Sequence, residues 1–314
     1  MKVLITGGSG YLGQFLICDL ASKSHRVAFT YNSHAVANKA IPWAHVSAHR
    51  VDLQTGEGLE ECVQSLGTVD VIINCAAISQ PGVCEKNTEL ARSINVPSAI
   101  LSSPALKAQQ TQPLLIHIST DQVYEGVKSL NAEDDETNPV NAYGRTKLEA
   151  EVAIRANWTN HAILRSSIIF GTTPPLVPVP RTLFVQWMEG ALTGPEEVSF
   201  FEDEWRNPIF VDDIIAVVNT LLVKDIDAVW PHRTFNMGGP HRLSRVDMAM
   251  QLAKVKQCSP DKIKAAPSAS VNRGVASPPD ISMDVNRITT ELGITLTSFE
   301  DGLRTFIKPY SEEA

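Results

Sequence analysis

The stretch Lys2-Val3-Leu4-Ile5-Thr6-Gly7-Gly8-Ser9-Gly10-Tyr11-Leu12-Gly13 opens the chain and decides its fold. Its apolar run at residues 3–5 is typical of a buried parallel strand. Three glycines then stand three residues apart, directly before a helical pattern. Such glycines permit a tight turn, a close approach of a pyrophosphate and packing of the helix on the sheet. We therefore expect a dinucleotide at the helix N-terminus, bound by Gly7, Gly10, Tyr11, Leu12 and Gly13.

Strand and helix patterns alternate through the first half of the chain. Repeated strand–helix–strand units predict a doubly wound parallel α/β sheet of the Rossmann class. Ligands in such sheets bind at the carboxyl ends of the strands. The expected strands are Arg26–Thr30, Val46–Val51, Val69–Asn74, Leu114–Ile118 and Ala162–Ile169, and the expected helices are Glu57–Leu66, Ala142–Asn157 and one within Leu90–Ala108 that is irregular near Pro97.

The character of the sequence changes after Gly171, where four prolines fall within Thr172–Pro180. Prolines resist regular structure, so this segment predicts a loop or a boundary. We expect a dinucleotide-binding domain over residues 1–171 and a smaller C-terminal α/β substrate-binding lobe over residues 172–314, partly interleaved with the first. Its expected elements are Leu183–Glu189, Val198–Phe201, Asp213–Val223, Val246–Lys256 with Ser244 as its cap, Asn286–Leu292 and Phe299–Ile307.

Composition excludes several classes of protein. The net charge of −8 argues against nucleic acid and anionic membranes as partners. No apolar run is long enough to span a membrane, and a strand that begins near Val3 leaves no room for a signal peptide. The five cysteines show no metal-type spacing, so we expect free thiols, no metal site and a cytoplasmic location.

Tyr143 and Lys147 stand four residues apart in an expected helix, so their side chains share one face. A tyrosine phenol has a pKa of about 10 in water, and a nearby ammonium lowers that pKa. We therefore expect Tyr143 to exchange a proton with a substrate oxygen near neutral pH, while Lys147 also reaches the cofactor ribose. A surface pair without a catalytic role is the competing interpretation, because this spacing is common.

Polar and small residues follow several expected strands. Thr120 is the candidate for polarising a substrate oxygen, with Ser119 as the alternate and a simple turn as the competing interpretation. Asp52 is placed to accept a hydrogen bond from the adenine amino group, or else it only forms a turn. The residues expected to contact the cofactor beyond the glycine turn are Asn32, Ser33, Asp52, Leu53, Cys75, Ala76, Ala77, Tyr143 and Lys147.

The end of the second strand favours NADP over NAD. NAD sites usually carry a carboxylate there for the ribose 2′-hydroxyl, and such a carboxylate would repel a 2′-phosphate. Here the segment reads Thr30-Tyr31-Asn32-Ser33-His34, without an acid. Ser33, His34 or Lys39 then contacts the phosphate, and NAD stays open as the alternative cofactor.

Four segments resemble the extended short-chain dehydrogenase/reductases: Thr6–Gly13, Asn74–Ala77, Ser119–Tyr124 and Tyr143–Lys147. Within that family, Ser119–Gly126, Leu164–Gly171 and Arg206–Asp213 resemble dTDP-4-dehydrorhamnose reductases and, equally, the regulatory beta subunit of methionine adenosyltransferase. The resemblance runs over nearly the whole chain.

The resemblance implies a triad of Thr120, Tyr143 and Lys147, in which Tyr143 protonates a forming alkoxide while the nicotinamide delivers hydride. The leading function is then an NADP(H)-dependent oxidoreductase that reduces a carbonyl on a sugar-like or other small substrate. Two alternatives stay open: a regulatory subunit that docks on a methionine adenosyltransferase catalytic subunit with little turnover, and a nucleotide-sugar epimerase. A homodimer also stays open.

Two features weaken the assignment of a nucleotide-sugar substrate. The second lobe shows no obvious arginine cluster for a diphosphate, and Arg181 and Arg206 are its scattered basic candidates. Ser277 stands before Pro278, where the resembling reductases favour arginine.

Overall fold

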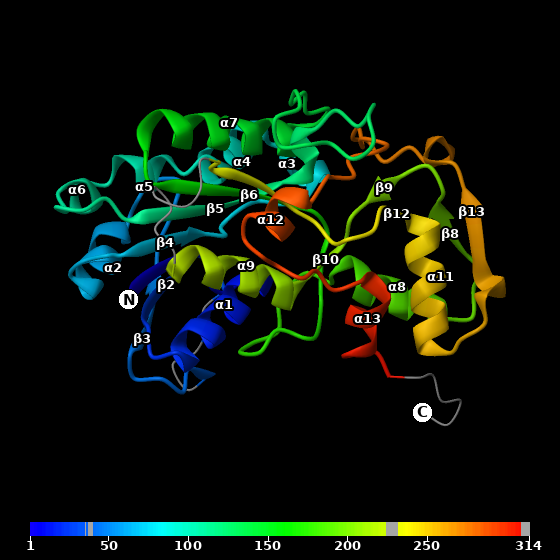
Figure 1. Ribbon diagram of the computed structural model, residues 1–314, viewed down its shortest axis with the longest axis horizontal. Coiled ribbons are helices and arrows are strands. Elements are labelled where there is room, and N and C mark those ends of the chain that lie inside the picture. Colours follow the sequence, from blue (N-terminus) through cyan, green and yellow to red (C-terminus); the bar gives the residue numbers. More distant parts are fainter. Residues whose placement is uncertain (35, 37–39, 224–231, 309–314) are drawn as a thin grey trace.

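The computed structural model describes residues 1–34, 36, 40–223 and 232–308 (Figure 1). A seven-stranded sheet in the order β11-β6-β5-β4-β1-β2-β3 lies at its centre, and every strand pairs with its neighbours in parallel. The expected Rossmann-like α/β fold is thus confirmed. The strands are β1 (Lys2–Thr6), β2 (Arg26–Tyr31), β3 (Val46–Arg50), β4 (Val71–Asn74), β5 (Leu114–Thr120), β6 (His161–Ser166) and β11 (Thr234–Met237).

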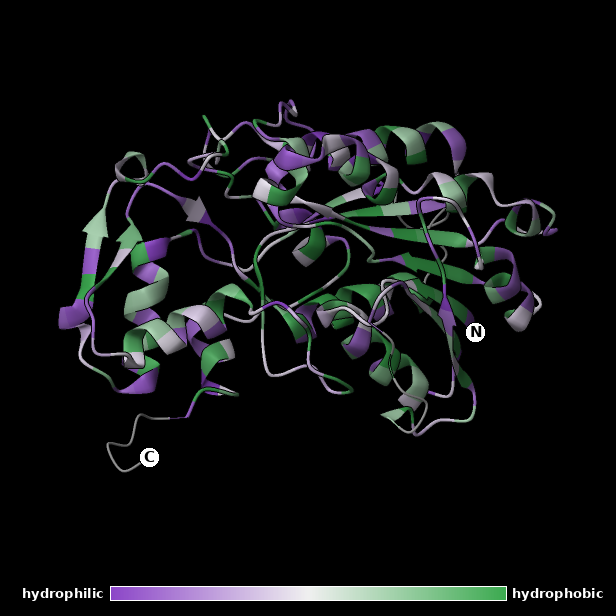
Figure 2. Cartoon of the chain, turned by 180° about the vertical axis from the view of Figure 1, so that it is seen from behind, coloured by the Kyte–Doolittle hydropathy of each residue, from purple (hydrophilic) through white to green (hydrophobic). Residues whose placement is uncertain are grey.

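Helices cover both faces of this sheet, because its strands are apolar on both sides, as Figure 2 shows. Val3 and Ile5 of β1 pack in one core with α1 and α9, and Leu4 packs on the opposite face with α2 and α7. The helices of these layers are α1 (Tyr11–Ser22), α2 (Leu59–Leu66), α3 (Pro81–Lys86), α4 (Thr88–Asn95), α5 (Ser98–Ser102), α6 (Pro104–Lys107), α7 (Ala142–Asn157) and α9 (Val211–Val223).

Two elements that were expected to be continuous are interrupted in the structure. The helix expected within Leu90–Ala108 is three helices, because Pro97 and Pro104 stand where α5 and α6 begin. The strand expected over Ala162–Ile169 ends at Ser166. The chain then leaves the sheet as β7 (Ile169–Phe170), which pairs with β10 (Ile209–Phe210).

A third apolar core organises most of the later chain, with Phe170, Met188 and Leu252 among its buried members. Ser244 caps α11 as expected, in a capping box with Asp247. The elements of this region are α8 (Phe184–Thr193), β8 (Val198–Phe201), β9 (Trp205–Arg206), β12 (Leu243–Ser244), α11 (Arg245–Lys256), β13 (Ile263–Ala266) and α13 (Phe299–Arg304).

Parts of the later chain leave this third core and return to the main sheet (Figure 1). α9 packs against α1, and β11 joins the main sheet beside β6, with α12 (Asn286–Thr290) packed on it. All three elements come after Gly171, so the division of the chain at that residue stays a prediction.

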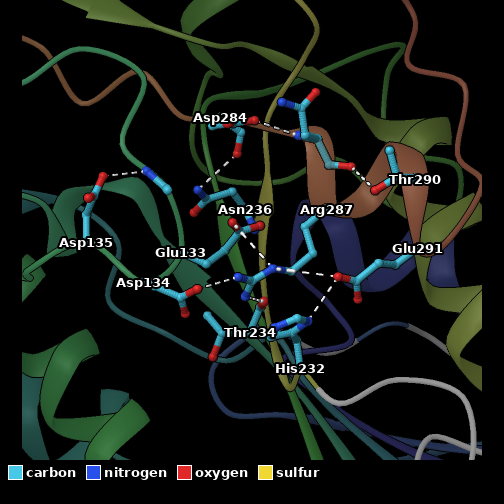
Figure 3. Close-up of polar contacts among 12 residues, drawn as sticks. Glu133, Asp134, Asp135, His232, Thr234, Asn236, Asp284, Arg287, Thr290 and Glu291 are labelled. Atoms are coloured by element: carbon cyan, nitrogen blue, oxygen red, sulfur yellow. Dashed lines mark hydrogen bonds and ion pairs between the residues drawn. The ribbon is translucent and has the colours of Figure 1, made fainter.

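Polar contacts tie the C-terminal segment to the sheet around β11 (Figure 3). The Nδ2 of Asn236 donates to the carbonyl oxygens of Asn131 and Asp284, at 2.8 and 3.1 Å. Arg287 donates to the carbonyl oxygen of Thr234 and to the carboxylate of Asp134. These bonds hold Asp284 and Arg287 against β11, although both residues lie far from that strand in the sequence.

A buried ion pair continues this network behind the carboxyl end of β5. The guanidinium of Arg165 on β6 donates to Glu151 on α7 at 2.8 Å, and also to the hydroxyl of Tyr124 and the carbonyl oxygen of Glu133. The Glu151 side chain has no exposed area, and it also accepts a hydrogen bond from Ser119. The pair therefore fixes α7 against β5 and β6.

We predict that Glu151→Gln lowers the free energy of unfolding by about 3 kcal/mol, because it leaves the buried charge of Arg165 without its counter-ion. Glu149→Gln is the matched control on the same helix, since Glu149 pairs with Arg92 at the exposed surface and its loss should change the free energy of unfolding far less. Urea unfolding of both variants measures the difference. Equal losses would contradict a structural role for the buried pair.

Candidate active site

The turn between β1 and α1 uses its glycines for close packing. Gly7 has a φ of +69°, and a Cβ on it would lie 2.8 Å from the Cα of Ala76. A Cβ on Gly13 would lie 2.5 Å from the carbonyl oxygen of Gly7. Gly10 is the N-cap of α1, so no side chain competes for the first N–H groups of the helix. This geometry suits a bound phosphate, and the contacts predicted for this turn, including those of Tyr11 and Leu12, stay predictions.

Two side chains of α1 fasten the proline-rich loop of residues 172–180 beside this turn. The hydroxyl of Tyr11 donates to the carbonyl oxygen of Thr172 at 2.8 Å. The buried Gln14 accepts from the N–H groups of Leu176 and Val177, at 3.0 and 2.9 Å. The sequence analysis missed Gln14, although a polar residue between apolar helix positions was a signal for it.

The end of β4 lies against the turn as expected. Cys75 and Ala77 line a cavity of about 530 Å³ at the carboxyl end of the sheet, and the backbone of Ala76 is the close neighbour of Gly7. Burial raises the pKa of the Cys75 thiol to about 12, so the thiol is neutral and is not a nucleophile at physiological pH. The predicted contacts of Cys75, Ala76 and Ala77 with a cofactor stay predictions.

The residues predicted for the adenosine end lie outside this cavity. Asn32 and Ser33 are exposed after β2. Asp52 forms the turn of the competing interpretation, because its Oδ1 accepts from the N–H of Gln54 at 2.8 Å. Leu53 packs partly buried on a core cluster, and Lys39 lies outside the described residues. Their contacts with a cofactor stay predictions.

Arg50 is a basic candidate that the sequence analysis missed. It ends β3 and is the register partner of Tyr31 at the end of β2, which places it near Asn32 and Ser33. Its side chain is exposed. The signal was the pairing of two consecutive strands, whose carboxyl ends meet at one edge of the sheet.

Tyr143 and Thr120 line one cavity of about 530 Å³ at the carboxyl end of the sheet. Thr120 is the last residue of β5, and Tyr143 lies in the first turn of α7. The Thr120 hydroxyl lies near enough to lower the pKa of the phenol, and it donates to Asp121 Oδ1 at 3.2 Å. The alternate, Ser119, donates its hydroxyl hydrogen to Glu151 at 2.6 Å instead. Thr120 is therefore the hydroxyl placed beside the phenol.

The expected lowering of the Tyr143 pKa is wrong in direction. Burial raises the pKa of Tyr143 to about 12, and the charge of Asp121 acts the same way, while the Thr120 hydroxyl and the charge of Arg181 oppose them. Lys147 is buried behind the cavity wall, and burial lowers its own pKa to about 8. The sequence shows the spacing of the two residues but not how deeply each is buried.

Arginines converge on the same cavity, which overturns the expectation that the second lobe lacks an arginine cluster. The lining includes Arg181, Arg206, Arg245 and Arg273. Glu204 pairs with Arg245 and Arg273, so part of the positive charge is balanced. These residues come from β9, α11 and separate loops, and nothing in their spacing along the chain indicates that they meet.

Arg245 offers the clearest contact for a ligand. Its Nη1 is buried and has no hydrogen-bond partner among the described residues. Burial lowers the pKa of Arg245 to about 10, so it still carries its charge at neutral pH. Its guanidinium lies 4.6 Å from the ring centre of Phe184. A buried cationic donor without a partner suits an anionic group of a ligand.

The sequence profile of the RmlD substrate binding domain matches residues 1–312. The chain belongs to this family. A probable low-salt glycan biosynthesis reductase, Agl14, from Haloferax volcanii is 27% identical to it, with 99% of each chain covered. The methionine adenosyltransferase 2 subunit beta of Bos taurus is also 27% identical, over 98% of this chain and 88% of its own.

Among solved structures, the dTDP-4-dehydrorhamnose reductase of Bacillus anthracis in complex with NADP shares the fold, with a TM-score of 0.78 and 22% identity. The alignment covers 97% of this chain and 98% of that one.

In the part of the chain that the structure describes, no helix has the length and apolarity needed to cross a membrane. The same residues contain no group of His, Cys, Asp and Glu side chains arranged for a metal ion.

We predict that Tyr143 stays protonated to about pH 11, because its pKa is about 12. Ultraviolet difference titration of the wild type against Tyr143→Phe isolates the tyrosinate signal of this residue. A signal with a midpoint at or below pH 10 would contradict the burial of the phenol.

Proposed function

We propose that this chain is a reductase that uses NADPH to reduce a carbonyl group on a small, sugar-like substrate that carries an anionic group. One observation carries the proposal: a single cavity is lined by Tyr11 and Leu12 at the start of α1, by a buried phenol and by an arginine cluster. The similarity to a probable glycan biosynthesis reductase over the whole chain supports it.

The proposed roles follow from the positions of the side chains. Bound at the glycine turn, the cofactor would supply hydride at the carboxyl end of the sheet. Tyr143 is the proton donor to the forming alkoxide, because its pKa keeps it protonated at neutral pH. Thr120 donates a hydrogen bond to the same oxygen. The family resemblance assigns the cofactor ribose to Lys147, which lies behind the cavity wall and donates to the carbonyl oxygen of Ile118.

NADP is the proposed cofactor because the edge formed by β2 and β3 suits a 2′-phosphate. The segment after β2 carries no carboxylate, and Arg50 is exposed at the end of β3. An arginine at this place accommodates a 2′-phosphate. A solved structure of the same fold holds NADP, which agrees with this choice. NAD is the alternative.

We predict that the wild type oxidises NADPH only when a suitable carbonyl compound is present, with dTDP-4-keto-rhamnose as the first to be tried. Tyr143→Phe removes the proton donor and lowers the rate about 10²- to 10⁴-fold. NADPH binding by this variant, followed by fluorescence, stays intact and serves as the control. Turnover that survives in Tyr143→Phe would contradict the assigned role.

A second function is favoured by the similarity to the methionine adenosyltransferase beta subunit. In that case the chain is a regulatory subunit that binds the cofactor and turns over little substrate. It would then shift the kinetics of a methionine adenosyltransferase even with Tyr143 replaced, and the carbonyl screen would be negative. An epimerase would instead form product without net oxidation of the cofactor.

We predict that Arg245→Met raises KM for an anionic substrate about 10- to 100-fold, because it removes a charge-assisted hydrogen bond. The value of kcat changes little if the arginine binds a part of the substrate that does not react. Arg242→Met is the matched control, since Arg242 pairs with Asp280 and does not line the cavity. Equal effects of the two variants would contradict an anion site at Arg245.

A further inference from the structure

A row of buried polar side chains crosses the middle of the sheet and ends at Lys147. Thr6, Asn74 and His117 are register partners on β1, β4 and β5. Each is at most 2% exposed, and Lys147 is 1% exposed. The strands around them are otherwise apolar, and polar groups in such a place are costly unless each is hydrogen-bonded.

The contacts along the row are continuous. The hydroxyl of Thr6 donates to Asn74 Oδ1 at 2.5 Å, and Asn74 Nδ2 lies 2.9 Å from His117 Nδ1. On the other side of the ring, His117 Nε2 lies 3.0 Å from Lys147 Nζ. Lys147 Nζ also donates to the carbonyl oxygen of Ile118 at 2.6 Å.

The donors and acceptors of this row allow one consistent assignment. Thr6 donates to the amide oxygen of Asn74, so the amide nitrogen donates to Nδ1 of His117. A neutral imidazole then carries its proton on Nε2, facing Lys147. An ammonium has no acceptor, so the Lys147 nitrogen that accepts this proton is the neutral amine. A charged Lys147 requires the reverse: the proton on Nδ1 and the Asn74 amide turned around.

The surroundings of Lys147 allow both its charged and its neutral form close to physiological pH. Burial lowers the pKa of Lys147 to about 8, while Glu151 on α7 and Cys75 after β4 act to raise it. Burial, with the charge of Lys147, holds the pKa of His117 well below its ordinary value. The ring therefore stays neutral while the lysine titrates, and only the position of the ring proton changes.

We infer that His117 is a positioning residue whose tautomer is coupled to the charge of Lys147, and that Asn74 and Thr6 favour the tautomer that pairs with the neutral amine. The position of the proton in the row does not depend on any reaction. Its effect on catalysis rests on the proposed reductase function, in which Lys147 lies between the cofactor ribose and the phenol. Burial lowers the pKa of Lys147 to about 8, and a row that favours the neutral amine acts in the same direction, so both withhold positive charge from this side of the pocket.

The test is nuclear magnetic resonance of the full chain labelled with 15N-histidine, without cofactor or substrate. The 15N shift of each ring nitrogen reports whether it carries a proton. Loss of one set of signals in His117→Gln assigns this ring. Above pH 9 we expect the His117 proton on Nε2, with a change of tautomer whose midpoint is near pH 8. Lys147→Met should abolish that midpoint.

Asn74→Asp reverses the direction of the hydrogen bond between residue 74 and His117, with little change in the shape of the side chain. An aspartate accepts from Nδ1–H, so the ring presents its Nε2 lone pair to Lys147. We expect the proton on Nδ1 at all pH values, so that the change of tautomer near pH 8 disappears. Asn95→Asp is the matched control, because Asn95 is also fully buried and bonds Thr146, next to Lys147, but lies outside the row. It should leave the tautomer unchanged.

Thr6→Val is the second variant, since it removes only the hydroxyl that fixes the Asn74 amide and keeps the shape of the side chain. It should raise the Lys147 midpoint and populate both tautomers. A His117 proton on Nδ1 at every pH in the wild type, or a tautomer unaffected by both Asn74→Asp and Thr6→Val, would overturn the inference. Neither result depends on whether the chain reduces a carbonyl, so failure of the proposed function is seen separately in the NADPH assay.

Discussion

The packing of α7 on β5 through buried polar contacts is the constraint on which the site depends. Lys147 bonds the carbonyl oxygen of Ile118, and Glu151 one turn later bonds Ser119 and Arg165. Charged side chains without such partners would not be tolerated between a helix and a sheet. These bonds fix the rotation of the helix about its axis, and with it the place of Tyr143 at the carboxyl end of the sheet.

The substrate side of the cavity is built on a different principle. Its arginines come from β9, α11 and two loops, and they meet because the chain crosses between two regions that share elements. Arg206 fixes the loop of Pro278 and Pro279 by donating to both carbonyl oxygens. Ser277, which stands where the resembling reductases favour arginine, also lines the cavity. Arginines from other segments thus supply positive charge near that position.

Local patterns in the sequence predict the parts of this protein that are determined locally. The glycine turn, the parallel sheet and the helix Ala142–Asn157 all follow from short-range rules, and the structure has each of them. The arginine cluster could not be predicted, because its members are far apart in the chain and only the tertiary path brings them together. The sign of the Tyr143 pKa shift could not be predicted either, because it depends on burial, which the spacing of two residues does not reveal.

The direction of that shift decides the protonation state in which Tyr143 meets a substrate at neutral pH. A phenol with a pKa of about 12 is protonated at neutral pH, so it can give a proton to a forming alkoxide but is a poor acceptor for the proton of an alcohol. Moreover, an amine at position 147 that is partly neutral near pH 8 lends the phenolate less support than a full ammonium would. Both features favour the protonated phenol. The buried row behind Lys147 and the depth of Tyr143 therefore act together to keep the phenol in the form that gives a proton to a forming alkoxide.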